Sequence, residues 1–189
     1  YAEIKRILSI DIIEPASCPC SSPIVLIPKP DGSVRFCIEY RRLNVVTVNG
    51  SYAIPRIDDF LDSFGSVRCF STLEENSGYW QINVAQEDLD KTAFTSHRGL
   101  FRFKRIPFGL KTAPATFQRA IDVILSTVRF QYDLTYLDDI FIYSPTFEQH
   151  LLDLAAVLTL LRNSGVSLKI AKCAFAASQV KYLGVIFGA

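Results

Sequence analysis

Apolar residues recur at helical spacing in four stretches of the chain, residues 2–10, 55–64, 113–126 and 146–163. This period places the apolar side chains on one face of a helix, so each stretch is predicted to be an amphipathic helix. The second helix has proline in its first turn and ends before Gly65, and the fourth stops at Asn163-Ser164-Gly165. Proline at the start and glycine after the end are typical of helix boundaries.

Shorter runs of apolar and β-branched residues predict strands. These runs cover residues 22–28, 34–38, 69–73, 92–95, 101–104, 134–137, 140–143, 167–170 and 181–187. Turns at Asp31-Gly32 and at residues 97–99 predict two hairpins, and Asp138-Asp139 form the tip of a third. Because strands and helices alternate without a strict βαβ rhythm, the predicted class is α+β.

Composition places the chain among globular proteins. It has 189 residues, 49% hydrophobic and 21% charged, which is far from the signature of disorder. No uninterrupted apolar run approaches the length of a membrane span, so we expect a soluble protein without a membrane partner. The sequence contains no methionine and opens at Tyr1, so we expect it to be a piece of a longer polypeptide.

Cysteine usage favours reduced thiols over a zinc site. The five cysteines form no CxxC pair, and the sequence has only two histidines that could serve as further zinc ligands. Cys18 and Cys20 are the one close pair, which leaves a metal or redox element open as an alternative. Reduced thiols are the usual state of intracellular cysteines.

Charge is unevenly distributed although the net charge is only +1. Residues 91–119 contain seven basic residues, several phenylalanines and no acid, whereas residues 130–161 contain five acids and no lysine or arginine. This arrangement suits a phosphate-rich ligand held beside metal-binding carboxylates. Two solvated faces of opposite sign explain the pattern equally well.

The adjacent carboxylates Asp138 and Asp139 repel each other unless a cation neutralises them. Oxygen ligands without cysteine or histidine nearby favour Mg²⁺ or Mn²⁺. An ordinary acidic turn is the alternative. Glu74, at the end of the strand predicted over residues 69–73, is a candidate third carboxylate. Tyr79 and Trp80 follow it and could pack on a nucleotide sugar or base.

Several motifs carry a resemblance to a known family. Tyr136-Leu-Asp-Asp139 resembles the YxDD box of reverse transcriptases. Four further blocks agree with it in order: the first catalytic block at residues 70–81, the substrate-positioning block at 108–118, the fingers block at 35–44 and the primer-gripping hairpin at 180–184. The resemblance covers nearly the whole chain and is closest to gypsy-type LTR retrotransposons.

The resemblance implies the fingers and palm of an RNA-directed DNA polymerase, with an antiparallel palm sheet backed by helices. The two parts are expected in one unit, with fingers at about residues 1–66 and part of 90–115, and palm at about 67–89 and 116–189. Thumb, connection and RNase H regions are expected to lie outside this sequence. Implied partners are an RNA or DNA template with primer, a dNTP, and the remaining thumb, RNase H and integrase domains of a polyprotein. The expected location is the cytoplasm or a retroelement particle.

The same resemblance implies a site with two Mg²⁺ ions, Mn²⁺ being possible. Glu74, Asp138, Asp139 and the backbone carbonyl of Glu75 would hold the ions. Together they would activate the primer 3′ hydroxyl and steady the leaving pyrophosphate. Lys172 matches the lysine proposed to protonate the leaving group. The family has aspartate where this chain has Glu74 and usually an apolar residue where it has Glu75.

Further site residues follow from the matching blocks. The implied nucleotide-binding residues are Lys29, Arg35, Tyr79, Phe108 and Gly109. The implied template and primer residues are Lys111, Gln118, Tyr136, Tyr182, Leu183 and Gly184. Solvated charges at a turn remain the alternative for Lys29 and Arg35, and an ordinary core aromatic remains the alternative for Tyr79.

Departures from the family pattern leave three functional hypotheses. Glutamate at position 74 adds one methylene, roughly 1.5 Å of reach, which can displace a metal. Glu39 in place of aspartate and Ala53 in place of proline are milder changes. The chain is therefore expected to be an active polymerase fragment, a nucleic-acid-binding module without catalysis, or a structural remnant.

Overall fold

The computed structural model describes most of the chain, in two compact units. The described residues are 2–28, 32, 34–48, 50, 52, 67–129, 131–137, 139–182 and 184–188. The first unit comprises residues 1–50 and 79–113, and the second comprises 51–78 and 114–189. The helix predicted over residues 55–64 and position 53 lie outside the described residues, as does Asp31 of the first predicted turn.

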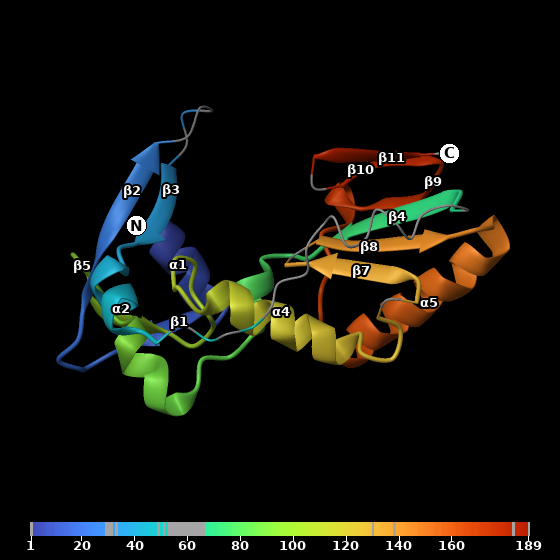
Figure 1. Cartoon of the computed structure of the whole chain (residues 1–189). Coiled ribbons are helices and arrows are strands. Elements are labelled where there is room, and N and C mark those ends of the chain that lie inside the picture. Colours follow the sequence, from blue (N-terminus) through green and yellow to red (C-terminus); the bar gives the residue numbers. More distant parts are fainter. Residues whose placement is uncertain are drawn as a thin grey trace. The chain divides into compact units, whose positions relative to one another are not determined.

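A five-stranded sheet forms the centre of the first unit (Figure 1), in the order β1-β6-β5-β2-β3. All neighbouring strands are antiparallel except β2 and β5, which are parallel. The strands are β1 (Ile13–Pro15), β2 (Ser22–Pro28), β3 (Val34–Ile38), β5 (Phe94–Ser96) and β6 (Gly99–Phe103). The helices are α1 (Ala2–Ser9), α2 (Arg41–Val46) and the 3₁₀ turns η1 (Gly78–Gln81) and η2 (Gln86–Thr92).

The core of the first unit is aromatic and aliphatic. Phe94 is completely buried between Phe101 and Phe103, with ring centroids 6.0 and 5.3 Å away. Ile4 and Ile7 bring one face of α1 against this cluster, as the helical spacing of the sequence predicts. The core thus joins the N-terminal helix to strands more than eighty residues later in the chain.

A four-stranded antiparallel sheet forms the second unit, in the order β7-β8-β4-β9. A separate hairpin, β10 with β11, follows it. The strands are β4 (Cys69–Glu74), β7 (Asp133–Tyr136), β8 (Asp139–Ser144), β9 (Ala174–Ala177), β10 (Gln179–Tyr182) and β11 (Val185–Gly188). The helices are α4 (Ala113–Ile124), α5 (Phe147–Asn163) and the 3₁₀ turn η3 (Ile170–Lys172).

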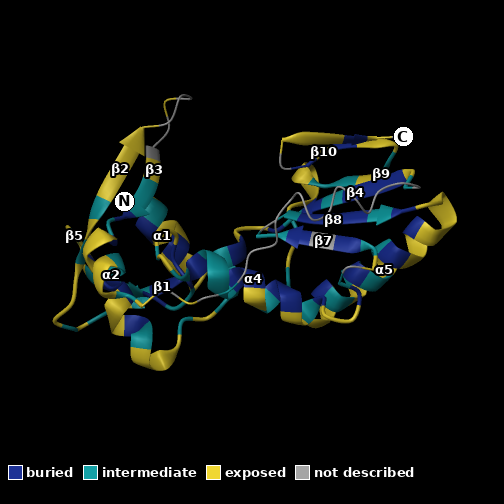
Figure 2. Ribbon diagram, in the orientation of Figure 1, coloured by how far each residue is buried: buried dark blue, intermediate teal, exposed yellow. Residues whose placement is uncertain are grey.

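Both faces of this sheet are covered, and buried residues concentrate on its strands (Figure 2). Phe141 on β8 contacts Phe70, Tyr182 and Phe187, which cover one face. Ile142, its neighbour on β8, points to the opposite face because successive side chains of a strand alternate, and α5 packs there. Burial on both faces fixes the register of β8 against its neighbours.

Three of the four predicted helices are present with boundaries close to those expected. At the start of α5 the Thr146 hydroxyl accepts a hydrogen bond from the Gln149 N–H at 3.2 Å, which satisfies one free donor of the first turn. Gly165, with φ 72°, follows its end. None of the helices within the described ranges is long and apolar enough to cross a membrane.

Some strand predictions were wrong. Residues 167–170 form no full strand: Leu168 makes one isolated antiparallel bridge with Glu75, in which the Lys169 N–H donates to the Glu74 carbonyl, and the chain then enters η3. Residues 181–187 form parts of two strands, since the chain reverses at Gly184, where φ is 88°. The alanine-rich strand β9 was not predicted. Asp139 belongs to β8 and not to the turn before it.

Candidate functional site

Glu74 and Asp139 lie directly opposite each other on neighbouring strands. Glu74 is the last residue of β4, Asp139 is the first of β8, and the two are partners in the antiparallel register. Cross-strand partners share one face of a sheet, so their carboxylates emerge on the same side. Like charges in this arrangement are destabilising unless a cation lies near them. Sixty-five residues of sequence separate the two carboxylates, and the β4–β8 pairing brings them together.

Lys172 provides a cationic partner for Glu74, one member of this carboxylate pair. Its ammonium group forms an ion pair and a hydrogen bond with Oε1 of Glu74. The backbone supports the contact, because the Lys169 N–H donates to the Glu74 carbonyl at 2.8 Å and the Lys172 N–H donates to the Lys169 carbonyl at 2.8 Å. The turn η3 therefore places Lys172 beside the end of β4.

Gln118 holds the turn between β7 and β8. Its side-chain oxygen accepts a hydrogen bond from the Leu137 N–H at 2.7 Å, and its amide nitrogen donates to the Thr135 carbonyl at 3.1 Å and to Asp122 at 3.0 Å. Leu137 has φ 54°, a left-handed conformation that is rare for leucine. Gln118 is completely buried. Its observed contacts thus stabilise the backbone immediately before Asp138, which lies outside the described residues.

An acidic cluster lies beside this turn, between α4 and β7. Asp122 accepts a hydrogen bond from the Tyr52 hydroxyl and forms an ion pair with Arg129 at 2.8 Å. Neither oxygen of Asp133, nor the hydroxyl of Thr135, has a partner of good hydrogen-bond geometry among the described residues. Burial raises the pKa of Asp133 to about 7, with Arg129 opposing the increase.

The residues expected at the primer lie on or near the β10–β11 hairpin. Tyr182 is 5% exposed, its ring stacks on Phe141 with centroids 4.8 Å apart, and its hydroxyl donates to the Asp139 carbonyl at 3.0 Å. Burial raises the pKa of Tyr182 far above its usual value. Tyr136 packs against the same cluster, Gly184 begins the reversal, and Leu183 lies outside the described residues.

An aromatic cluster of Tyr79, Trp80 and Phe108 lies in the first unit. The Phe108 ring is 5.2 Å from the Tyr79 ring and 5.7 Å from the Trp80 ring, centroid to centroid. Phe108 nevertheless remains 51% exposed. The side chain of Arg6 lies over the Trp80 ring at 5.4 Å, a favourable cation–π distance.

Asn44 fixes the loop that carries Phe108. Its amide nitrogen donates to the Gly109 carbonyl at 2.8 Å, and its amide oxygen accepts from the Lys111 N–H at 2.8 Å. Gly109 has φ 96° and a backbone close to Tyr40, which permits this path. The loop that carries three of the predicted site residues is therefore anchored to α2.

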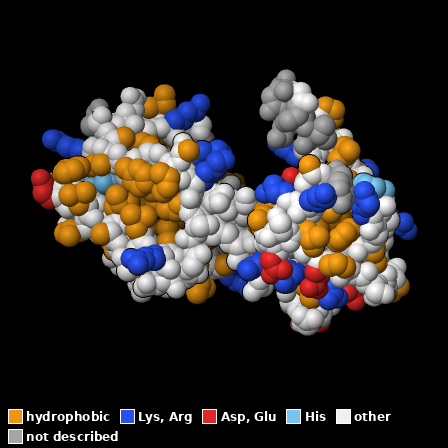
Figure 3. Space-filling model, turned by 180° about the vertical axis from the view of Figure 1, so that it is seen from behind, with side chains coloured by type: hydrophobic (Ala, Val, Ile, Leu, Met, Phe, Trp, Pro, Cys, Tyr) orange, Lys and Arg blue, Asp and Glu red, His pale blue; other side chains and the backbone are white. Residues whose placement is uncertain are grey.

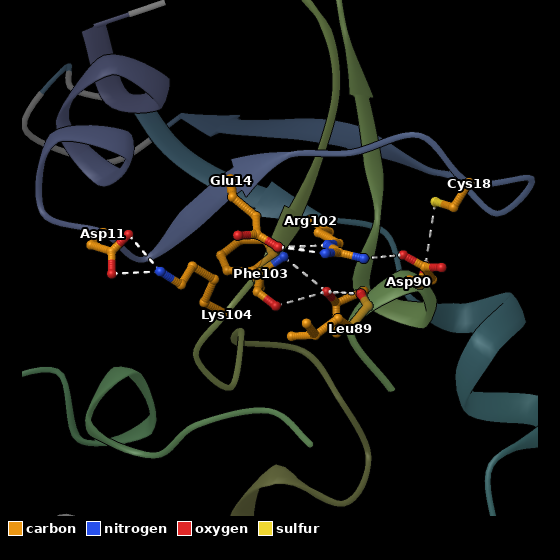
Figure 4. A network of polar contacts seen from close by, with 9 residues as sticks. Asp11, Glu14, Cys18, Leu89, Asp90, Arg102, Phe103 and Lys104 are labelled. Carbon is orange, nitrogen blue, oxygen red and sulfur yellow. Dashed lines mark hydrogen bonds and ion pairs between the residues drawn. The ribbon is translucent and has the colours of Figure 1, made fainter. Parts of the chain in front are cut away.

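Three of the seven basic residues at positions 91–119 form ion pairs with described residues of the first unit, and two of the three are drawn in Figure 4. Arg102 contacts Glu14 and Asp90, each at 2.6 Å, and Lys104 contacts Asp11 at 2.6 Å. Lys91 pairs with Asp88. On the face shown in Figure 3, lysine and arginine side chains form several separate groups on each unit and no continuous band.

Arg35 lies on β3 opposite Ile27 and is exposed, whereas Lys29 lies outside the described residues. Cys18 and Cys20 are free thiols, as are the other three cysteines. The Cys18 thiol contacts backbone carbonyls of Cys20 and Asp90. These contacts involve no second thiol, and they give no support to a disulfide at this pair.

The donor set at Glu74 and Asp139 suits a hard divalent cation, because it consists of carboxylate oxygens whose like charges need neutralisation. Among the described residues, which do not include Asp138, no three histidine, cysteine or acidic side chains form a metal-binding group. The carboxylate of Glu75 is 2% exposed and lies near Gly78 and Phe117.

The sequence did not predict the residues whose hydrogen bonds or burial lie behind the candidate site. Asn44, Tyr52 and Asp133 were not selected, and neither was the buried histidine His150. Asn44 stands inside the fingers block, which was a usable signal. Nothing in the sequence distinguishes Asp133 from an exposed strand residue, so its burial could be found only in the structure.

Comparison with known proteins adds the family. Residues 27–187 match the family described as "Reverse transcriptase (RNA-dependent DNA polymerase)". The chain belongs to the reverse transcriptase family. It is 39% identical over 189 residues to the "Retrovirus-related Pol polyprotein from transposon opus" of Drosophila melanogaster, covering 97% of this chain and 19% of that polyprotein. It is 34% identical over 190 residues to the polyprotein of transposon gypsy from the same organism, covering 97% and 18%.

These reverse transcriptase relatives confirm the gypsy-type resemblance, and the chain spans less than one fifth of the length of each. Among solved structures, the foamy viral protease-reverse transcriptase in complex with RNA/DNA hybrid matches with a TM-score of 0.89 at 24% identity, covering 98% of this chain and 25% of that chain. At this identity the match concerns the fold, and it confirms the predicted α+β polymerase fold.

Proposed function

We propose that this reverse transcriptase chain adds deoxynucleotides to a primer by metal-assisted phosphoryl transfer. The observation that carries the proposal is the direct pairing of Glu74 with Asp139 at one end of the palm-type sheet. Family membership supports the same reaction. The first unit would then supply the fingers and the second unit the palm.

Glu74 and Asp139, with Asp138 and the Glu75 backbone carbonyl, would hold two Mg²⁺ or Mn²⁺ ions. When bound, such ions supply the charge that activates a primer 3′ hydroxyl and steadies the leaving pyrophosphate. Lys172 would donate a proton to the pyrophosphate. Its contact with Glu74 supports a place at the site, because an ammonium group paired with one catalytic carboxylate lies within a few ångströms of the reacting phosphates.

The remaining predicted residues would bind and orient substrates. Arg35 and Lys29 would contact the triphosphate, Arg35 through its bidentate fork. Tyr79 would exclude a ribose 2′ hydroxyl by bulk, and Phe108 and Gly109 would line the nucleotide site. Contact between the Tyr79 and Phe108 rings supports this, because each ring limits the movement of the other.

The template would be an RNA or DNA strand, and the primer would be its complement. The solved foamy viral protease-reverse transcriptase, which this chain resembles in fold, is in complex with RNA/DNA hybrid in one structure and with double-stranded DNA in another, which supports this choice. Lys111, Tyr136, Tyr182, Leu183 and Gly184 would contact them. Gln118 would act on the template through the turn that it holds. Thumb, RNase H and integrase domains would be supplied by the polyprotein, in the cytoplasm or a retroelement particle.

Primer extension on an RNA template with Mg²⁺ or Mn²⁺ tests the proposal. We expect the native chain to incorporate deoxynucleotides, Glu74→Asp to match or exceed it, and Asp139→Asn to lose activity by a factor of 100 or more, about the effect of removing one electrostatic contributor. Equal activity of Asp139→Asn and the native chain would overturn the site assignment.

A nucleic-acid-binding module is the second candidate, favoured by the contact between Lys172 and the longer side chain of Glu74. In that case neither the native chain nor Glu74→Asp extends a primer. Both still bind a primer–template in fluorescence anisotropy, with affinity that falls steeply as salt rises. Affinity independent of salt would contradict phosphate-driven binding in either candidate.

A further inference from the structure

A buried chain of hydrogen bonds joins three strands and one helix of the second unit. The Ala176 N–H on β9 donates to the Ser71 hydroxyl on β4 at 3.0 Å, and Ser71 contacts Nε2 of His150 on α5 at 2.7 Å. The other ring nitrogen, Nδ1, contacts the Ser144 hydroxyl on β8 at 3.0 Å. Ser144 in turn donates to Oδ2 of Asp153 at 2.6 Å.

All four side chains of this network are withdrawn from water. Ser71 and His150 are 0% exposed, Ser144 is 1% and Asp153 is 3%. The second oxygen of Asp153 accepts from the Gln149 side chain at 2.8 Å. Because no solvent is available to replace a missing partner, each hydrogen in the chain must have an acceptor inside the protein.

The positions of the hydrogens follow from the two ends of the hydrogen-bond network, the Asp153 carboxylate and the Ala176 N–H. Ser144 gives its hydrogen to the carboxylate of Asp153, so Ser144 accepts from His150 and Nδ1 carries a hydrogen. Ser71 accepts the Ala176 N–H, and its own hydrogen needs a buried acceptor; among the described residues that acceptor is Nε2 of His150, which is therefore bare. His150 is therefore neutral with its hydrogen on Nδ1. Burial also lowers the pKa of His150 below its usual value, although Asp153 opposes this effect.

The first hydrogen bond of this network, from Ala176 to Ser71, lies at an irregularity of the sheet. Pairing of β9 with β4 shifts register by one residue, and Ala176 within this bulge has φ 49°. An extra residue in a bulge loses its ladder partner. The Ser71 hydroxyl supplies a replacement acceptor, so the bulge depends on a side chain that His150 orients.

We propose that His150 is a positioning residue for the end of β4 that carries Glu74. As the neutral Nδ1–H tautomer it aims the Ser71 hydroxyl so that Ser71 accepts the Ala176 N–H and fixes β9 against β4. The strand β9 begins two residues after Lys172, and Lys172 contacts Glu74. His150 thus acts on the Lys172–Glu74 pair through β9, without touching either residue. The catalytic part of this inference rests on the proposed function, whereas the tautomer and the bulge contact do not.

Long-range ¹H–¹⁵N correlation of the histidine rings in the 189-residue native chain tests the tautomer directly. We expect a hydrogen-bearing Nδ1 and a bare Nε2 for His150 at neutral pH. A hydrogen on Nε2, or on both nitrogens, would overturn the proposal. This measurement needs neither a variant nor enzymatic activity.

Amide exchange at Ala176 tests the mechanical part. Ser71→Ala should speed exchange about tenfold, the size expected for loss of one hydrogen bond, and Ser71→Thr, which keeps the hydroxyl, should restore protection. His150→Asn should speed the same amide, because the residue keeps a donor toward Ser144 but leaves Ser71 without its acceptor. Thr159→Ala is the matched control, since it removes an exposed hydroxyl from the same helix. Native exchange at Ala176 in His150→Asn would refute the positioning role.

Primer extension tests the catalytic part separately. His150→Asn should lower kcat about tenfold or more while the KM for dNTP stays within about twofold, as expected when reacting groups are misplaced but substrate contacts remain. A rise in KM alone would contradict the inference. If the native chain does not extend a primer, the proposed function fails, and the ring tautomer and Ala176 exchange still decide the role of His150.

Discussion

Replacing Asp133 with asparagine should stabilise the protein at neutral and alkaline pH and change little in mild acid. The Asp133 side chain is completely buried and its oxygens have no partner of good hydrogen-bond geometry among the described residues. Burial is the main cause of the rise in its pKa to about 7, and the nearby Asp122 adds to the rise. Arg129 only partly offsets it, because its guanidinium is paired with Asp122.

The magnitude follows from proton linkage. The ordinary pKa of 3.8 applies to the unfolded chain, against about 7 in the fold. Between these values the unfolded chain has released its proton and the folded protein retains it, so the free energy of unfolding falls as pH rises, by about 1.4 kcal/mol per pH unit. The loss is absent below about pH 4 and complete above about pH 7, where it amounts to about 4 kcal/mol. Asparagine has no proton to lose, so Asp133→Asn lacks this slope.

Urea unfolding followed by circular dichroism, at steps from about pH 4 to about pH 9, measures both slopes. The control is Asp88→Asn, which removes a carboxylate from an exposed ion pair and should leave the native pH dependence in place. Equal slopes for the native chain and Asp133→Asn between about pH 5 and about pH 7 would show that the Asp133 carboxyl is not held neutral, and the reasoning from burial would be refuted.

Three further substitutions test other contacts. Gly78→Ala would place a methyl group 2.6 Å from the buried Phe117 ring and should cost about 2 kcal/mol of unfolding free energy; an unchanged melting temperature would show that the ring can move aside. Gln118→Leu leaves the Leu137 N–H unpaired and should cost about 2 to 4 kcal/mol in urea unfolding; an unchanged urea midpoint would show that the turn does not need this contact. Asn44→Ala should speed exchange of the Lys111 amide about fivefold, and native protection there would contradict the anchoring role.

The sequence predicted best the features that depend on local periodicity. Helix α5 was expected from its apolar spacing over residues 146–163, and it is present at Phe147–Asn163. The turn before β8 was misplaced by one residue, because Leu137 reads as a strand residue and adopts a left-handed conformation only with help from Gln118. That contact spans 19 residues, beyond what a local pattern can indicate.

The candidate site was predicted as a set of residues and not as a set of contacts. Family resemblance selected Glu74 and Lys172, but their ion pair joins residues 98 apart in sequence and depends on the η3 turn, which was not predicted. Buried polar groups were missed for another reason. A serine or histidine on a strand or helix reads as a surface residue until the packing on both faces of the sheet is known.

The interleaving of the two units has a consequence for biosynthesis. Strand β2 pairs with β5, so Ser22 can form its strand contact only after Phe94 has been synthesised. The segment between these residues includes β4 of the other unit. A ribosome that releases the chain from its N-terminus therefore cannot complete the first sheet until β6, which ends at Phe103, has emerged. During that interval β4 is already exposed with neither of its neighbours made. Neither unit can be excised as one continuous piece, and a nascent chain needs protection of β4 until β8 is synthesised.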